Sequence, residues 1–270
     1  MYPVLLKFQL LGKEIIIGTY GVLIVLSMAA GIFLTLRIAR YFKYKKDDVL
    51  NYSLLVLVSS FIGTFLVGFL VFLPERIEEG FFNYQSALVS WGGLLGGLVA
   101  LYLIKKKWSA NLLNLADIGT PAYLIGFGIG RIGCFFGGCC FGIPTSSPIG
   151  VKFIHQLAPA SSMNAHLIPT QLISAAFLIV TGLIFIAPVI KRRIPGFVFF
   201  SSTIVYSIFR FIIEFFRADH RKFFFKLSDG QLFSLGFFIL GVIGLIYVAG
   251  KKEKLIKNLK YLHNNSGRDI

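Results

Sequence analysis

Charged residues are scarce in this chain, and their scarcity excludes an ordinary soluble domain. Only 14% of the 270 residues are Asp, Glu, Lys or Arg, whereas 56% are hydrophobic. Soluble globular domains carry about 25% charged residues, because much of their surface faces water. A chain this apolar is expected to lie within a membrane.

The apolar segments also lack the alternation of polar and apolar residues that membrane-spanning β-strands show. They are continuous runs of about 20 residues, the length of a helix that crosses a hydrocarbon core about 30 Å thick. The first run lacks the cleavage site of a signal peptide, so we expect it to be a span. The sequence therefore predicts an all-α integral membrane protein with about seven transmembrane helices, at approximately 15–36, 50–73, 86–104, 115–131, 171–190, 196–213 and 231–249.

Acidic residues are few, with 12 Asp and Glu against 27 Lys and Arg and a net charge of +15. Because no acidic residues line a path through the spans, an ion channel is not favoured. The basic excess does not indicate nucleic-acid binding either, because it is divided into clusters beside alternate span ends, at 37–46, 105–107, 191–193 and 251–268. Such clusters stay in the cytoplasm, so the N-terminus is expected outside and the C-terminus inside.

Residues 1–250 are predicted to form a single polytopic membrane domain, without an internal repeat or a separate soluble domain. Its longest connection, 132–170, is rich in Gly, Pro and Ser and is expected to form an outer-face loop or cap. Residues 251–270 are predicted to form a basic cytoplasmic tail on the anionic inner leaflet.

The loop after the sixth span breaks the charge rule, because it is basic although it is expected to face outward. Arg210, Glu214 and Arg217 approach it with a spacing that places all three on one helix face. An arginine within a span costs at least ~2.5 kcal/mol on insertion scales, so it needs a partner or a task. Two interpretations remain: a salt bridge that anchors the helix, or an anion site in which Glu214 orients one arginine toward a phosphate.

Residues 130–142 combine Arg131, five glycines and all three cysteines of the chain. Tyr20, Gly92, Gly93 and Gln171 are predicted to lie in the same outer half of the membrane. Taken singly, Tyr20 fits an interfacial aromatic belt and the glycines fit close helix packing. Together with two arginines at one depth, they indicate a cavity that admits a lipid headgroup.

The cysteines, Cys134, Cys139 and Cys140, leave several chemistries open. A disulfide between Cys134 and one of the others is expected outside the cytoplasm. Zinc would need a fourth ligand, which only His155, His166 or His220 offers, and a thiol beside Arg131 is also a candidate nucleophile. We interpret His155 and His166 as solvated loop residues, and no metal or cofactor is predicted.

Several short motifs within residues 15–250 resemble, in type and order, those of the bacterial prolipoprotein diacylglyceryl transferases. They are Tyr20-Gly21, the Gly-Gly-Leu-Leu-Gly of 92–96, Asp117, the Gly-Arg-Ile-Gly of 130–133, Gly142, the Pro-Thr-Gln-Leu of 169–172, and Arg210 with Glu214 and Arg217. The resemblance implies a multi-pass enzyme of the bacterial cytoplasmic membrane. Such an enzyme moves the diacylglyceryl group of phosphatidylglycerol to the lipobox cysteine of a prolipoprotein signal peptide and releases glycerol phosphate.

By position in these motifs, the resemblance implies catalytic roles for Arg131, Arg210 and Tyr20, with the two arginines holding the lipid phosphate. It implies substrate-binding roles for Gly92, Gly93, Gly133, Gly142, Gln171, Glu214 and Arg217.

The chain departs from this pattern where the family has polar residues. Trp91 and Ile168 stand where the family has histidines, Cys134 replaces an asparagine, Cys139 a glutamate, and Ile173-Ser174 a Tyr-Glu pair. Every histidine candidate for a general base is therefore missing. Alternatives to the family reaction are a divergent enzyme with another acceptor, a cysteine thiol that acts as a covalent relay, and a non-catalytic lipid-binding or transport protein.

Overall fold

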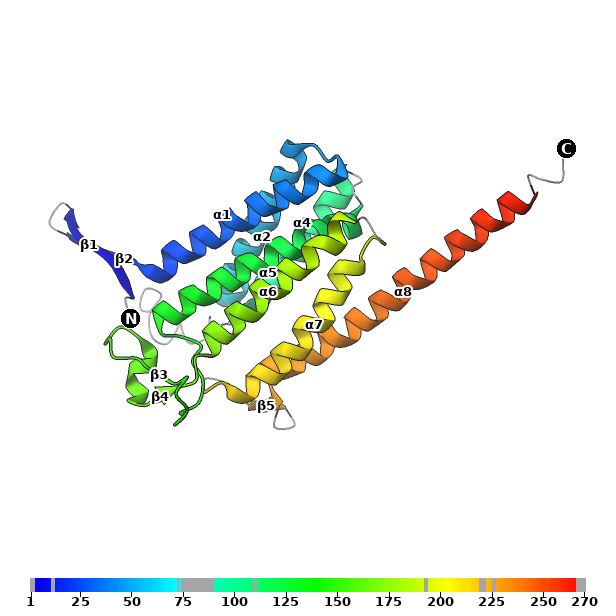
Figure 1. Cartoon of the computed structure of the whole chain (residues 1–270). Coiled ribbons are helices and arrows are strands. Elements are labelled where there is room, and N and C mark those ends of the chain that lie inside the picture. Colours follow the sequence, from blue (N-terminus) through cyan, green and yellow to red (C-terminus); the bar gives the residue numbers. More distant parts are fainter. Residues whose placement is uncertain are drawn as a thin grey trace. The chain divides into compact units, whose positions relative to one another are not determined.

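The computed structural model of the chain describes residues 3–10, 13–71, 73, 90–108, 111–191, 194–218, 222–224 and 227–265. Its helices confirm the predicted all-α class with about seven helices (Figure 1). They are α1 (Thr19–Ala39), α2 (Lys46–Val71), α4 (Ser90–Trp108), α5 (Leu112–Gly137), α6 (Thr170–Ile190), α7 (Phe197–Ile213) and α8 (Asp229–Asn265). All except α4 belong to the six that are long and apolar enough to cross a membrane.

Large apolar side chains cover the outside of these helices. Phe61 on α2 is 60% exposed, Ile184 on α6 is 64% exposed, and Ile246 on α8 is 68% exposed. Water would make so much exposed apolar surface unfavourable, whereas lipid tails make it favourable. The chain is therefore a multi-pass membrane protein.

The N-terminal segment is a β-hairpin, and the predicted start of the first span at residue 15 is wrong. Strand β1 (Val4–Leu10) pairs antiparallel with β2 (Lys13–Gly18), which includes the β-branched run Ile15 to Ile17. The length of the apolar run predicted a helix from residue 15. The β-branched side chains at its start favour extended backbone instead, and the strand forms there. The Thr19 amide donates to the Pro3 carbonyl at 3.0 Å, which ties the hairpin to the start of α1.

The fourth helix is longer than predicted, because α5 runs from Leu112 to Gly137 rather than over 115–131. Its glycines are packing positions, not breaks. A Cβ atom on Gly126 would lie 2.9 Å from the Ser27 carbonyl oxygen of α1, and one on Gly128 would lie 3.0 Å from the Ala175 carbonyl oxygen of α6. Small residues let membrane helices approach this closely.

The chain forms two compact units, one of residues 1–34 and 116–270 and the other of residues 35–115. In the second unit, α2 and α4 pack with their backbones in contact. A Cβ atom on Gly92 would collide with the Gly63 carbonyl, and one on Gly96 would collide with the Ser59 carbonyl. A Cβ atom on Gly93 would lie 2.7 Å from Thr64 Oγ1. Close packing of α2 against α4 therefore explains why residue 92 is glycine. This is one of the two interpretations that the sequence alone leaves open for the glycines.

The connection between α5 and α6 is ordered and begins at Gly138 rather than at the predicted residue 132. It contains β3 (Val151–Lys152), paired antiparallel with β4 (His166–Leu167), and the 3-10 helix η2 (Pro159–Met163). Phe153, Ala160 and Leu167 form a small apolar core, against which Phe135 of α5 packs. This core fixes the loop to the end of α5.

Asp117 is a helix cap. Its carboxylate accepts hydrogen bonds from the backbone amides of Gly196, at 2.7 Å, and Phe199, at 2.8 Å, at the start of α7. A carboxylate there satisfies amides that have no partner within the helix and complements the helix dipole. The residue thus joins α5 to α7 within the first unit.

After α7 the chain forms the 3-10 helix η3 (Glu214–Phe216) and the short strands β5 (Lys222–Phe224) and β6 (Leu227–Ser228). Helix α8 then packs along α7, where a Cβ atom on Gly241 would lie 2.7 Å from Ile204 Cγ1. Because α8 continues unbroken to Asn265, most of the predicted tail of 251–270 is the C-terminal part of that helix.

Candidate functional site

Five helices of the first unit begin or end at the same end of that unit (Figure 1). The chain enters or leaves this end at the start of α1, the end of α5, the start of α6, the end of α7 and the start of α8. These ends carry the site residues Tyr20, Arg131, Cys134, Gln171, Arg210 and Glu214 together with Gly230. This arrangement is expected, because successive spans cross the membrane in opposite directions and these five helix ends then fall on the same side.

The end of α5 brings two cysteines together by local geometry alone. Gly138 has a positive φ of 69°, its amide donates to the Phe135 carbonyl, and the Cys139 amide donates to the Cys134 carbonyl at 3.1 Å. This is a Schellman motif, in which the residues corresponding to Cys134 and Cys139 normally make a side-chain contact. A Cβ atom on Gly138 would also collide with Ala158.

The start of α6 holds the next part of the loop. Gln171 Nε2 donates to the Cys139 carbonyl at 2.7 Å, and Thr170 Oγ1 donates to the Cys140 carbonyl at 2.8 Å. Cys140 is held in the left-handed region with φ of 57°. Both anchoring side chains are buried, so the cysteine loop has a fixed backbone.

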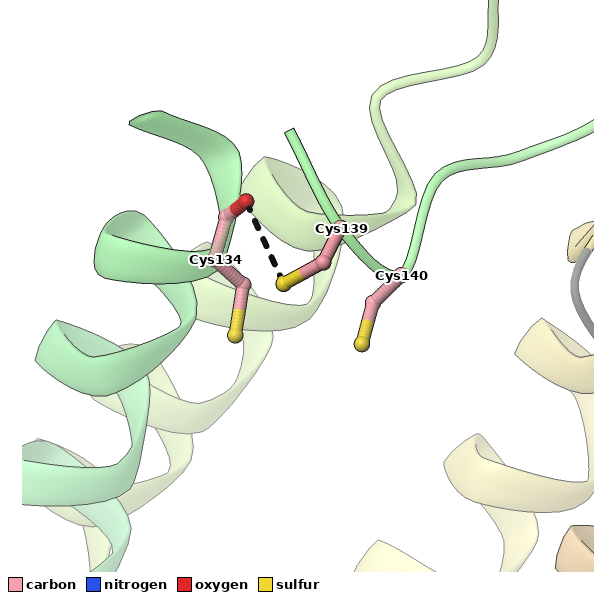
Figure 2. Close-up of side chains that lie close together, drawn as sticks. All are labelled: Cys134, Cys139 and Cys140. Carbon is pink, nitrogen blue, oxygen red and sulfur yellow. Dashed lines mark hydrogen bonds between the residues drawn. The ribbon is translucent and has the colours of Figure 1, made fainter. Parts of the chain in front are cut away.

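The three cysteine side chains gather at this point as free thiols (Figure 2). Their sulfur atoms all lie within 4.8 Å of one another, and Cys139 Sγ lies 3.7 Å from the Cys134 carbonyl oxygen. The disulfide expected from the sequence is not formed in this structure. Each cysteine is partly exposed, so the cluster is accessible.

The loop cysteines have different proton affinities. The pKa of the Cys140 thiol is lowered, chiefly because the thiols of Cys134 and Cys139 donate hydrogen bonds to its sulfur. The charges of Arg217 and Arg131 act in the same direction. The pKa of Cys139 is raised, because its proton is held in hydrogen bonds to the other two sulfurs. The cluster is therefore suited to hold negative charge on sulfur.

Gly142 joins the loop to the segment after α7. Its amide donates to the Ile168 carbonyl at 3.0 Å, it forms a β-bridge with Arg217, and the following Ile143 amide donates to the Phe216 carbonyl. A Cβ atom on Gly142 would lie 2.6 Å from the Ile168 oxygen and 2.7 Å from the Phe216 oxygen. The close packing of three backbone segments therefore requires glycine here.

Replacing Gly142 with alanine is expected to destabilise the fold, because the two nearest atoms that the new methyl group would meet belong to the backbone. Overpacking of this kind costs about 1–3 kcal/mol. Thermal unfolding of the detergent-purified protein would show the loss. Gly119→Ala is the matched control, because a Cβ atom there meets no described atom within 4 Å. Equal melting temperatures for the two variants would contradict the packing role.

The end of α7 carries a buried ion-pair network. Arg210 Nη1 pairs with Glu214 Oε2, and Arg217 Nε lies 4.0 Å from the same oxygen. The side-chain exposures are 19% for Arg210, 5% for Glu214 and 14% for Arg217. The structure thus confirms that the three side chains meet, although α7 ends at Ile213 and Arg217 is extended.

Ser228 supports this network, although it is not among the residues predicted from the sequence. Its hydroxyl donates to Glu214 Oε1 at 2.9 Å and accepts from the Gln231 amide, while Gln231 Oε1 accepts from the Ser228 amide. This is a capping box at the start of α8, and its Ser-x-x-Gln signature is readable in the sequence. A Cβ atom on Gly230 would lie 2.8 Å from Arg210 Nη2, so α8 begins directly against the ion pair.

Arg131 approaches the same end from α5. Its guanidinium lies 4.9 Å from the centre of the Phe127 ring, and its buried Nε has no hydrogen-bond partner among the described residues. The buried Oε1 of Gln171 also lacks a partner within this set. Unsatisfied buried polar atoms are costly, and at a functional site they indicate groups that bind a ligand.

Tyr20 packs against α5 at its last turns. A Cβ atom on Gly133 would lie 3.4 Å from the Tyr20 ring, and one on Gly137 would lie 3.6 Å from Tyr20 Cβ. The phenol lies within electrostatic range of the three thiols and of Arg131. Gly133 therefore serves the close approach of α1 to α5, which brings Tyr20 to the cluster.

Positive charge dominates this end of the first unit. Arg210 lies within electrostatic range of both Arg217 and Arg131, while Glu214 is the carboxylate paired within the group. Three guanidinium groups, two of them beside the carboxylate of Glu214, leave an excess of positive charge among the side chains described there. Such a group favours an anion, and a phosphate can accept bidentate hydrogen bonds from arginine.

Other predicted candidates belong to the second unit, do not join the thiol cluster or fall outside the described residues. Gly92 and Gly93 belong to the second unit. His166 is exposed and His155 is partly exposed, and neither joins the thiol cluster. His220, considered above as a zinc ligand, lies outside the described part of the chain.

Comparisons with known proteins agree with the motifs. A family described as prolipoprotein diacylglyceryl transferase matches residues 6–247. A phosphatidylglycerol–prolipoprotein diacylglyceryl transferase of Clostridium tetani is 33% identical over 244 residues, which cover 90% of this chain and 96% of that protein. A second enzyme so named, from Clostridium perfringens, is 32% identical over 88% of this chain and 94% of its own length. A Francisella tularensis subsp. novicida protein of the same name is 29% identical over 94% of this chain and 97% of its own.

Proposed function

The chain belongs to the prolipoprotein diacylglyceryl transferase family, and we propose that it transfers the diacylglyceryl group of phosphatidylglycerol to the cysteine thiol of a prolipoprotein signal peptide. The observation that carries this proposal is the family match over residues 6–247. The matched range includes Arg131, Arg210 and Arg217. These three arginines supply the anion site that the phosphate of a phospholipid donor requires.

In the proposed reaction, the acceptor sulfur attacks the glyceryl carbon that carries the phosphate ester. A C–S bond forms, the C–O bond breaks, and the electron pair leaves with glycerol phosphate. Negative charge therefore develops on the phosphate oxygen. Arg131 and Arg210 would stabilise that charge, because their donors are in place before the reaction begins.

The remaining site residues would position these groups. Glu214 and Ser228 hold Arg210, and Arg217 adds charge to the same group. Gln171 holds the cysteine loop, and Gly142 holds that loop against the segment after α7. Tyr20, beside Arg131 and the thiols, would contact the lipid glycerol or the acceptor.

The proposed location is the bacterial cytoplasmic membrane, with the site at its outer leaflet. The distribution of Lys and Arg supports this orientation, because the basic clusters flank the opposite ends of the helices. Prolipoproteins present their signal peptide cysteine at that surface, so donor and acceptor would meet there.

Complementation tests this function in cells. A bacterial strain depleted of its own transferase should recover growth and lipoprotein modification when it expresses this chain. Arg131→Ala should fail to rescue, whereas Gly119→Ala should rescue. Phosphatidylglycerol binding without rescue would contradict the enzyme and support a non-catalytic lipid-binding protein, the alternative motivated by the missing histidines.

A further inference from the structure

We propose that Cys134, Cys139 and Cys140 bind one zinc ion, and that its fourth coordination position takes the thiolate of the acceptor cysteine. No metal is predicted from the sequence alone, because the histidines offer no fourth protein ligand at a recognisable spacing. The structure shows that three ligand atoms already converge. An open fourth position is what a catalytic zinc site retains.

The positions of the sulfur atoms carry this inference. All three lie within 4.8 Å of one another, and they come from the last turn of α5 and the loop that follows (Figure 2). A tetrahedral zinc ion bound at about 2.3 Å to each thiolate sets sulfur–sulfur separations of roughly 3.8 Å. The sulfur atoms are therefore within about 1 Å of the separations that a zinc site sets.

The backbone that presents the sulfurs is fixed independently of a metal. The Schellman motif places Cys134 beside Cys139, and Gln171 and Thr170 hold the carbonyls of Cys139 and Cys140. A metal ion would therefore bind a preorganised loop and would not have to order a disordered one. Preorganisation of ligands lowers the entropic cost of binding.

The ligand type and the charge of the surroundings select zinc. Thiolates are soft ligands that favour zinc over magnesium or calcium, which prefer oxygen. Three thiolates and one Zn²⁺ carry a net charge of −1, and Arg131 and Arg217 lie within electrostatic range of Cys140 to balance it.

The fourth position is open to a substrate. Within the part of the chain that the structure describes, the group of His, Cys, Asp and Glu side chains able to share this ion consists of the three cysteines. All three are partly exposed, so a ligand can reach the site. A thiol is the natural fourth ligand for a soft cation with three thiolates.

The role of the metal in transfer rests on the proposed function. The acceptor cysteine binds zinc as a thiolate and releases its proton to water, because a coordinating thiol is deprotonated by the ion. The bound sulfur then attacks the glyceryl carbon, the C–S bond forms, and the C–O electron pair leaves with glycerol phosphate. No redox change occurs, and no histidine base is needed.

Metal content and transfer are measured separately on full-length protein, purified in detergent with a reductant. We expect about one zinc per chain by inductively coupled plasma mass spectrometry. Cys134→Ser, Cys139→Ser and Cys140→Ser should each reduce the content to below about one tenth, because each removes a ligand. Arg210→Lys and Gly119→Ala should keep their zinc. Wild-type protein without zinc, or a triple serine variant with the wild-type content, would overturn the site.

Cobalt replacement tests the fourth position on unmodified protein, which avoids any variant that fails to fold. Cobalt-loaded protein should show near-ultraviolet sulfur-to-cobalt absorption. That spectrum should change when a lipobox peptide with cysteine is added, and remain constant with the matched serine peptide. Equal responses to both peptides would overturn the acceptor role.

The two proposals fail in different ways. Full transfer by chelator-treated, zinc-free protein would leave the proposed function standing and overturn the metal role. Stoichiometric zinc in a wild-type protein that transfers nothing would leave the metal site standing and contradict the proposed function. Mass spectrometry that finds a disulfide or a lipid adduct on these cysteines in active protein would also overturn the zinc site.

Discussion

Replacing Arg131 with alanine is expected to lower the rate of diacylglyceryl transfer by about 10²-fold to 10³-fold, the loss seen when a preorganised donor to a developing negative charge is removed. Arg131 suits this role because its buried Nε has no hydrogen-bond partner among the described residues. Arg131 also lies within electrostatic range of Arg210, so both guanidinium groups would act on the phosphate that leaves the lipid. Radiolabelled phosphatidylglycerol and a lipobox peptide would measure the rate.

The kinetic constants distinguish this role from simple binding. An interaction made only in the transition state lowers kcat, whereas one that is equal in both states raises KM. We expect the loss to fall mainly on kcat. Arg131→Lys keeps the charge but loses the planar fork, so it should recover only part of the activity. Folded Arg131→Ala protein with normal kcat would contradict the assignment.

Replacing Glu214 with alanine is expected to cost about 3–5 kcal/mol of stability, because removing one partner of a buried ion pair leaves the other charge unpaired. Glu214 is 5% exposed and accepts from Ser228 while it pairs with Arg210. Its loss would also release the start of α8, which begins against this pair. Thermal unfolding in detergent and the yield of folded protein would measure the effect.

Two further variants separate charge from hydrogen bonding at this position. Glu214→Gln keeps an acceptor for Ser228 but removes the charge that balances Arg210. Ser228→Ala keeps the charge and removes two hydrogen bonds, one to Glu214 and one from the Gln231 amide, at a cost of about 2 kcal/mol. We expect alanine at Glu214 to destabilise the most and Ser228→Ala the least. A Glu214→Ala protein as stable as the wild type would refute the structural role of the pair.

The helices could be predicted from the sequence, because apolar runs of membrane length are nearly sufficient to specify them. Their ends could not. The run that begins at Ile15 is apolar enough for a span, yet its first residues pair with β1. The glycines of α5 are helix breakers in water, but in a membrane helix they are contact positions. Hydropathy alone does not distinguish an apolar residue in a strand from one in a helix, or a glycine that packs from one that breaks a helix.

The placement of Arg131 and Arg210 at the same end of the first unit could also be predicted, because alternation of spans places the end of α5 and the end of α7 on the same side. The structure confirms that the two charges lie within range of each other. Ser228 was missed although its capping box is visible in the sequence, because it falls between a basic loop and an apolar run. Its hydrogen bond to Glu214 depends on the packing of α7 against α8.

The cysteine cluster shows a different limit. The spacing of Cys134, Cys139 and Cys140 left a disulfide, a metal site and a nucleophile open. The left-handed turn at Gly138 brings Cys134 and Cys139 together, and the anchors on α6 then fix Cys140. A glycine at the end of a helix predicts this motif, but a long-range contact from Gln171 cannot be read from local sequence.

One assay tests the central claim most directly. Purified chain is incubated with phosphatidylglycerol labelled in its diacylglyceryl group and a lipobox peptide, and label on the peptide thiol is measured together with released glycerol phosphate. The account predicts labelled cysteine peptide, an equal amount of glycerol phosphate and no label on the matched serine peptide. Lipid that binds but yields neither product would contradict it.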